Sequence, residues 1–182
     1  MLAEDIHKAA NALIRIHGES PYDIAEGLGI KLIQNFDFKK LYGMYTVIKR
    51  KRIIILNGNL DDGLKKTVLA HELGHDRLHR ELAVNRVVHD VMLYDMRLRP
   101  EYEANMFAAE LLIRDDDIFE LMRDYGYSAK QTAVRLGLST ALVTIKLTSM
   151  QLRGLEIPGV ITPDAAMFKF GSPSGRAVRE AD

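Results

Sequence analysis

The chain has 182 residues, and its 47% hydrophobic content is enough for one compact domain with a core. Its 25 basic and 25 acidic residues give a formal net charge of zero, which argues against a general binder of polyanions. Because the sequence has no cysteine, it excludes disulfides and thiolate metal sites, so any metal must be held by histidines and carboxylates.

The predicted elements begin with two helices and a small sheet. Hydrophobic residues at helical spacing predict a helix over residues 6–17 and a short second one over 21–28. A strand is expected at 30–33. The β-branched runs 45–48 and 52–56 surround a basic turn and therefore predict a hairpin.

The second half is predicted to be helical. One helix runs from about Leu64 beyond Leu78 after an aspartate cap, and Pro100 is typical of the first turn of the next. Residues 128–136 and 139–152, joined by a glycine turn, form a helix–turn–helix pattern. The sequence therefore predicts an α+β fold.

The pentapeptide His71-Glu72-Leu73-Gly74-His75 is the strongest functional signal. Two histidines four residues apart on a helix lie on the same face, so both can bind one metal ion. Glu72 then lies next to the metal as a general base, which is the arrangement of zinc peptidases. A glycine inside a helix costs about 1 kcal/mol relative to alanine, so at Gly74 we expect another backbone to approach closely.

A catalytic zinc needs a third protein ligand and an open position for water. Glu101 and Asn105 share one face of the helix that begins at Pro100, so Glu101 can bind the metal while Asn105 hydrogen-bonds a ligand imidazole. Glu103 is the second candidate. His79 would lie about 12 Å along the helix from His71, too far for one ion, which favours a role in the second shell, beside the substrate or in packing.

Each of these residues could also have a purely structural role. His71 and His75 can be core histidines satisfied by hydrogen bonds, and Glu101 and Glu103 can be solvated helix charges. The combination of the histidine pair with Glu72 and a downstream acidic helix favours the metal site.

Two parts of the mechanism need further residues. Tyr94 and His89 are candidate donors to the oxyanion, and the sequence does not select between them. An edge strand beside the active-site helix is expected to hold the substrate extended, and we assign this role to Arg52, Ile53, Ile54, Ile55 and Leu56.

These residues together resemble the ImmA/IrrE family of metallopeptidases. The resemblance rests on the pentapeptide with His79, on Ile53-Ile-Ile-Leu-Asn57 upstream, and on Glu101-x-Glu-Ala-Asn105-x-Phe107-Ala-Ala-Glu-Leu111-Leu112 downstream. It covers about residues 20–153. One departure is Ile113-Arg114, where the family often has Met-Pro; this changes a helix end rather than the metal site.

The resemblance implies a small gluzincin-like fold in which two histidines and one glutamate hold Zn²⁺. It also implies a regulatory protease, since some members cleave a helix–turn–helix repressor. On this basis we expect residues 1–125 to form a zincin-like domain with a short antiparallel sheet packed on the active-site helix. Residues 126–154 would form a helix–turn–helix-like subdomain, and 155–182 an irregular tail.

The helix–turn–helix segment fits its template through Thr132, Ala133 and Val143, but its second helix offers a single basic residue, Lys146. Reading DNA normally requires more cationic and amide side chains, so a structural or substrate-docking role is favoured over DNA binding. The rival interpretations are a DNA-binding regulator and a phage or toxin–antitoxin protein whose metal is structural.

The expected location is the cytoplasm. The N-terminus lacks the layout of a signal peptide, and no apolar run approaches the roughly 20 residues of a membrane span. The expected partner is a protein substrate such as a repressor encoded nearby, and the sequence leaves the oligomeric state open.

Overall fold

The computed structural model describes residues 1–83, 87–90 and 98–157, with the backbone alone for 87–90. The fold is α+β, as predicted. The helices are α1 Ala3–His17, α2 Pro21–Gly27, α3 Asp62–Leu78, η1 Arg80–Ala83, α4 Arg99–Leu112, α5 Asp115–Ile118, η2 Phe119–Asp124, α6 Ala129–Leu136 and α7 Thr140–Leu152. The strands are β1 Lys31–Asn35, β2 Gly43–Ile48, β3 Lys51–Asn57 and β4 Val87–Asp90.

The four strands form one mixed sheet in the order β1-β3-β2-β4. The predicted hairpin is present, since β2 and β3 pair antiparallel, and β2 also pairs antiparallel with β4. The sheet differs from the expected antiparallel one because β1 runs parallel to β3. The chain reverses direction at β2, so that β3 runs in the same direction as β1 and lies between β1 and β2.

The central place of β3 corrects one sequence-based assignment. Both of its neighbours pair with it, so its backbone donors and acceptors are used within the sheet. The prediction that Arg52, Ile53, Ile54, Ile55 and Leu56 form the edge strand beside the site is therefore wrong. The outer edges of the described sheet belong to β1 and β4.

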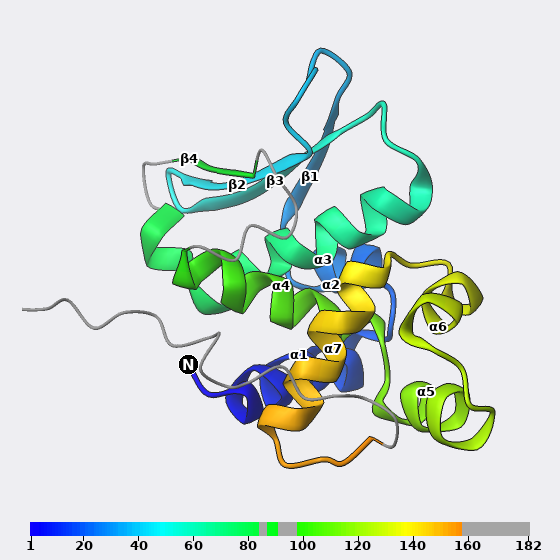
Figure 1. Ribbon diagram of the computed structural model, residues 1–182. Helices are drawn as coiled ribbons and strands as arrows, with labels where there is room; N and C mark the ends of the chain where they lie inside the picture. Colours follow the sequence, from blue (N-terminus) through cyan, green and yellow to red (C-terminus); the bar gives the residue numbers. More distant parts are fainter. Residues whose placement is uncertain (84–86, 91–97, 158–182) are drawn as a thin grey trace, which may run out of the picture.

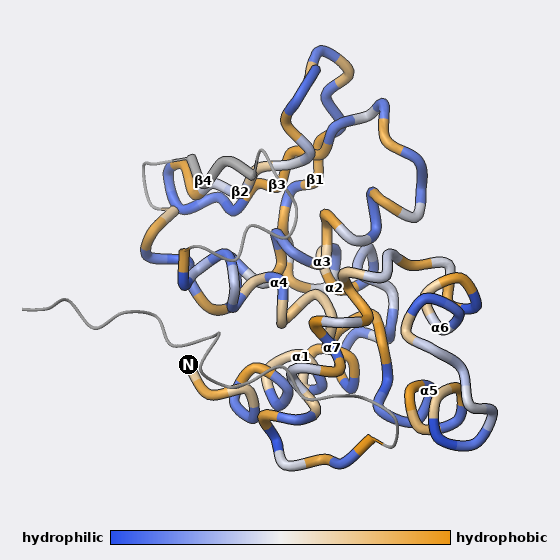
Figure 2. The backbone as a smooth tube through the Cα atoms, viewed as in Figure 1, coloured by the Kyte–Doolittle hydropathy of each residue, from blue (hydrophilic) through white to orange (hydrophobic). Residues whose placement is uncertain are grey.

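Three layers position the functional residues (Figure 1). The sheet covers α3, α4 lies beside α3, and α1 and α7 pack on the other side of α4. Hydrophobic stretches run along β3 and α7 (Figure 2). None of the helices in the described parts of the chain is long and apolar enough to cross a membrane.

Asp76 fastens α3 to the sheet directly after the second histidine of the motif. Its buried carboxylate accepts hydrogen bonds from the Tyr45 hydroxyl at 2.6 Å, Arg52 at 3.0 Å and Arg80 at 3.1 Å. Arg52 also donates to the backbone carbonyl of Leu28, so it bridges three elements. Burial, together with the bond to Asp76, raises the pKa of the Tyr45 hydroxyl, which therefore remains a donor.

The helix–turn–helix segment shares the core of the domain before it. Gly137 ends α6 with a φ of 67°, in the left-handed region, and the chain then turns directly into α7. Leu142, Val143 and Met150 of α7 belong to the same hydrophobic cluster as Ile6 of α1. The core is thus continuous across the boundary expected near residue 125.

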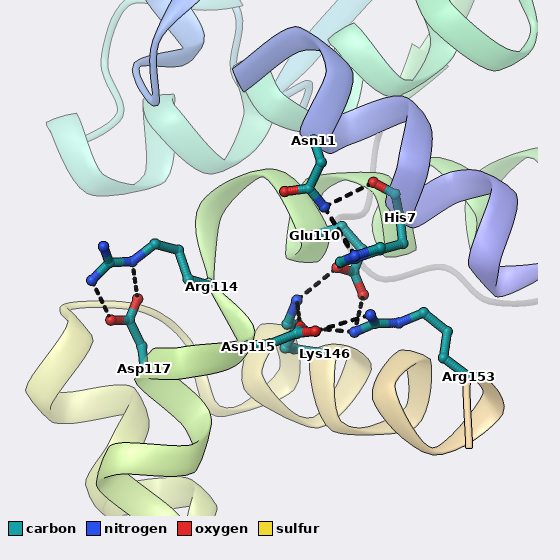
Figure 3. A network of polar contacts seen from close by, with 8 residues as sticks. All are labelled: His7, Asn11, Glu110, Arg114, Asp115, Asp117, Lys146 and Arg153. Carbon is teal, nitrogen blue, oxygen red and sulfur yellow. Dashed lines mark hydrogen bonds and ion pairs between the residues drawn. The ribbon is translucent and has the colours of Figure 1, made fainter. Parts of the chain in front are cut away.

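A buried ionic cluster ties α7 to α4 and α5 (Figure 3). The ammonium of Lys146, only 1% exposed, lies 2.6 Å from carboxylate oxygens of both Glu110 and Asp115. Arg153 donates to both oxygens of Asp115, at 2.9 and 2.7 Å, and His7 lies 2.7 Å from Glu110. The two acidic groups therefore enclose a cation that the protein supplies itself.

Replacing the buried ammonium tests how much this cluster stabilises the fold. Lys146→Met keeps most of the stem but removes the ammonium that Glu110 and Asp115 share, and it leaves them with His7 and Arg153 alone, so we expect a loss of about 3 kcal/mol in the free energy of unfolding. Urea denaturation measures it. The exposed Lys130→Met is the control, with an expected change within about 0.5 kcal/mol. Equal stability of the two variants would contradict the assignment.

The cluster also predicts a dependence on pH. Burial alone would raise the pKa of Asp115, but hydrogen bonds from Arg153 and Lys146 outweigh it and lower the pKa from 3.8 to about 2. A depressed pKa means that the carboxylate stabilises the fold above pH 3.8 and that this contribution disappears as the pH falls toward 2. In urea denaturation of metal-free protein, the stability difference between wild type and Asp115→Asn should shrink over this range. A constant difference would argue against it.

Candidate metal centre

The contact between α3 and α4 is close because one residue on α3 lacks a side chain. A Cβ on Gly74 would lie 3.0 Å from the Cα and 3.1 Å from the carbonyl oxygen of Ala104. The expected close approach of another backbone at Gly74 is therefore confirmed. It lets side chains from both helices converge on the same point.

Three side chains meet where the helices converge. His71 Nε2 lies 3.0 Å from His75 Nε2 and 3.2 Å from Glu101 Oε2, and His75 Nε2 lies 3.4 Å from the same carboxylate oxygen. Both histidines are buried, whereas the Glu101 side chain is 15% exposed. Of the three side chains, Glu101 is therefore the one that solvent reaches.

This group fits a small divalent cation. A tetrahedral ion with bonds of 2.0–2.1 Å holds its ligand atoms about 3.3 Å apart, close to the three separations observed. The Nδ1 of His71 lies 2.9 Å from Asn105 Oδ1, which accepts a hydrogen bond from the Nδ1–H and so leaves the Nε2 lone pair directed at the group. Two imidazole nitrogens and one carboxylate oxygen are ligand types that suit zinc.

Protonation states also suit metal binding. Burial lowers the pKa of His75 to about 4, although Glu101 acts in the opposite direction. Burial would raise the pKa of Glu101, but hydrogen bonds with His71 and His75 hold it well below its usual range. At neutral pH the imidazole of His75 is neutral and the carboxylate of Glu101 is ionised, which are the forms that bind metals.

Glu72 lies beneath the sheet and is fully buried. A Cβ on Gly43, the first residue of β2, would lie 3.0 Å from Glu72 Oε1 and 2.5 Å from a methyl group of Val68. The missing side chain at Gly43 therefore provides the space in which the carboxylate sits. Neither Gly43 nor Asp76 was identified from the sequence. Of these two residues, only Asp76 could have been suspected from the sequence, because it directly follows His75.

The other candidate ligands lie apart from the group of three. Glu103 points to the amino group of Met1 and to Arg99, whose Nε is 2.9 Å from Glu103 Oε1. His79 caps the end of α3, with its Nε2 3.4 Å from Glu103 Oε2 and its ring centroid 5.9 Å from that of His75. The structure thus separates Glu101 from Glu103, which the sequence left as alternatives.

The two candidate oxyanion donors remain predictions. Tyr94 lies outside the described residues. His89 lies in β4, where its backbone pairs with that of Met44, and its side chain is not described.

Comparisons with known proteins agree with this geometry. The family model of the IrrE N-terminal-like domain matches residues 25–148, about two thirds of the chain. Immunity region protein 2 of Bacillus phage phi105 is 30% identical over 142 residues, which are 78% of this chain and 88% of that protein. Metallopeptidase ImmA of Bacillus subtilis strain 168 is 28% identical over 152 residues, covering 81% and 87% of the two chains.

A side chain at the helix contact should disturb the metal centre. Gly74→Ala adds a methyl group against the backbone of Ala104, and overpacking of this kind costs about 1–3 kcal/mol, against about 1 kcal/mol gained in helix propensity. Because the strain is relieved by moving α4 from α3, we expect zinc affinity to fall about tenfold, or 1.4 kcal/mol.

Competition with a chromogenic chelator measures that affinity. Gly63→Ala, on the same helix, is the control, since its Cβ would lie 3.9 Å from the Gly137 carbonyl oxygen and 3.3 Å from Asp61 Oδ1, a side-chain atom rather than backbone of α4. If both variants bind zinc like the wild type, the helix contact does not set the ligand geometry.

Proposed function

The chain belongs to the family of the IrrE N-terminal-like domain, a family of peptidases, and from this premise we propose that it is a zinc-dependent metalloendopeptidase with a specific protein substrate. One observation carries the proposal: the donor atoms of His71, His75 and Glu101 lie 3.0–3.4 Å from one another at the contact of two helices. A peptidase of this kind is a hydrolase that acts on peptide bonds.

The roles of the ligand residues follow from their contacts. His71, His75 and Glu101 would hold the ion, and Asn105 fixes the ring of His71 through its Nδ1–H. A bound zinc ion supplies Lewis acidity, which activates water at neutral pH and polarises a carbonyl group. Solvent reaches the centre at the partly exposed Glu101, so a substrate would approach from that side.

Glu72 is the proposed general base. It follows His71 on α3, and its carboxylate would take a proton from the attacking water and then deliver it to the leaving amine. Gly43 keeps the backbone of β2 against this carboxylate, which limits the positions that Glu72 can adopt. Tyr94 and His89 remain the candidates for stabilising the oxyanion.

The edge strand β4 replaces β3 as the proposed site of the extended substrate. Asp90 at the end of β4 pairs with Gly43, the residue that packs on Glu72, whereas β1 lies on the far side of β3. Among the described strands, β4 is therefore the edge strand nearer to the proposed base. A peptide bound there would add a strand to the sheet.

A helix–turn–helix repressor is the proposed substrate. The relative from Bacillus phage phi105 bears the name of an immunity region protein, which agrees with a target encoded by a mobile element. Such a target would place the protein in the cytoplasm. We assign transcription regulation to the protein through cleavage of this repressor.

The rival function, DNA binding by α7, has weaker support. Lys146, the single basic residue of that helix, is buried in ion pairs with Glu110 and Asp115 and is not available to a phosphate. A structural metal would need no base, and the presence of Glu72 directly after the proposed ligand His71 favours catalysis over that alternative.

Glu72→Gln separates catalysis from metal binding. The amide cannot accept the proton of water, so we expect cleavage to fall by at least a hundredfold while the zinc content stays at that of the wild type. Co-expression with a candidate helix–turn–helix repressor, followed by mass spectrometry, detects the products, and atomic absorption measures zinc. Glu26→Gln, an exposed carboxylate, serves as the control.

His71→Ala should lose both zinc and activity, since it removes a ligand. Undiminished cleavage by Glu72→Gln would remove Glu72 from its proposed role. Retention of zinc by His71→Ala would show that the ion binds elsewhere.

A further inference from the structure

An open pocket of about 330 Å³ lies beside the metal centre, between the end of α3 and the start of α4. It is linked to the ligands through His79, which follows His75 by one turn of α3 and whose ring centroid lies 5.9 Å from that of His75. Glu103, two residues after Glu101, projects to another side of α4, where its Oε2 lies 3.4 Å from His79 Nε2. The lining residues are Met1, Leu78, His79, Arg99, Pro100 and Glu103. A substrate bound at the metal would therefore place a neighbouring side chain near this pocket.

The pocket combines apolar walls with one carboxylate. Leu78 and Pro100 supply apolar surface, and the Glu103 side chain is only 7% exposed. Lysine and arginine side chains have an apolar stem and a cationic head, and they bind best where both parts find a partner. The lining thus suits a basic side chain.

The structure already contains an ammonium group in this position. The amino group of Met1 pairs with Glu103 Oε1, which also accepts from Arg99 Nε. On the other side of the carboxylate, His79 Nε2 lies 3.4 Å from Oε2. Arg99 and the ammonium thus share one oxygen of the carboxylate, and Met1, Arg99 and His79 all line the pocket.

The Met1 contact can be displaced at low cost. Met1 is 47% exposed, so its departure uncovers little buried surface. An incoming lysine ammonium or arginine guanidinium would form the same charge-assisted hydrogen bond with Glu103. The carboxylate would then keep a cationic partner in both states of the pocket.

We propose that this pocket is a specificity subsite in which Glu103 recognises a lysine or arginine of the protein substrate close to the scissile bond. The proposal rests on the proposed peptidase function. In it Glu103 contacts the substrate and selects it, while Glu72 and the metal ligands carry out the reaction. A purely structural Glu103, linking α1 to α4, would make no distinction between basic and neutral peptides.

Peptide selection tests the subsite without requiring cleavage. A randomised octapeptide mixture, acetylated at its amino termini and containing norleucine, is passed over immobilised full-length, zinc-loaded Glu72→Gln protein. Mass spectrometry of the retained peptides should show lysine and arginine enriched about tenfold over norleucine at one position, the discrimination expected of one ion pair. Norleucine keeps the stem of lysine without its charge, so the comparison isolates the ion pair.

Two further variants define the outcome. Adding Glu103→Gln should abolish the enrichment, whereas Glu103→Asp, which keeps the charge, should retain part of it. Glu81→Gln, a nearby exposed carboxylate, is the matched control and should leave it unchanged. Zinc content and circular dichroism establish that each variant is folded. Absence of basic enrichment, or enrichment that persists in Glu103→Gln, overturns the proposal.

Exposing the same mixture to wild-type protein distinguishes the subsite from the peptidase function. Cleavage without preference for basic residues supports the peptidase and overturns the subsite. Glu103-dependent retention without cleavage of any peptide supports the subsite and argues against the peptidase.

Discussion

The close contact between α3 and α4 at Gly74 and Ala104 is the constraint on which the proposed centre depends. Two histidines on one helix can only provide two ligand atoms, and the third donor must come from another backbone at a fixed distance. A single methyl group at Gly74 would occupy the space that brings Glu101 within 3.2–3.4 Å of both imidazoles. The helix accepts a residue of low helix propensity there because the tertiary contact requires it.

Each of the two helices is also fixed outside this contact. On α3, Asp76, the residue after His75, accepts hydrogen bonds from Tyr45 of β2 and Arg52 of β3. These bonds fix the distance between the sheet and the helix. On α4, Glu110 is enclosed by Lys146 and His7. Preorganisation of this kind holds the ligand geometry before an ion arrives.

Local patterns predicted the helices and the hairpin well, because capping and periodicity act within a few residues. Asp61 caps α3 as expected, and Gly18 and Gly137 end their helices. The position of β1 next to β3 was not predictable in the same way, since strand order depends on pairings between distant segments. The misassigned substrate strand has this origin, because β-branched residues identify a strand but not whether it lies at an edge.

The candidate site was predictable to the extent that it depends on helical spacing. Spacing gave the group of His71, His75 and Glu101 and the contact between Asn105 and His71, because residues four apart share a face. It placed Glu101 before Glu103 but could not exclude Glu103, because the position of either carboxylate relative to His71 and His75 depends on how the two helices cross. Gly43 was missed because nothing in the sequence around it reports that Glu72 packs against its Cα.

The helix α4 carries a proposed metal ligand near its start and the anchored Glu110 nine residues later, about 14 Å along its axis. A helix of 14 residues moves largely as one body, so a displacement of one end reaches the other. Metal binding and the ion pairs with Lys146 therefore stabilise the same helix, and both contribute to the free energy that keeps it ordered. A chelator removes the metal at the start of this helix, and acid weakens the ion pairs near its end. The loss of either contribution lowers the free energy of unfolding, so the protein then unfolds more readily when the other is lost.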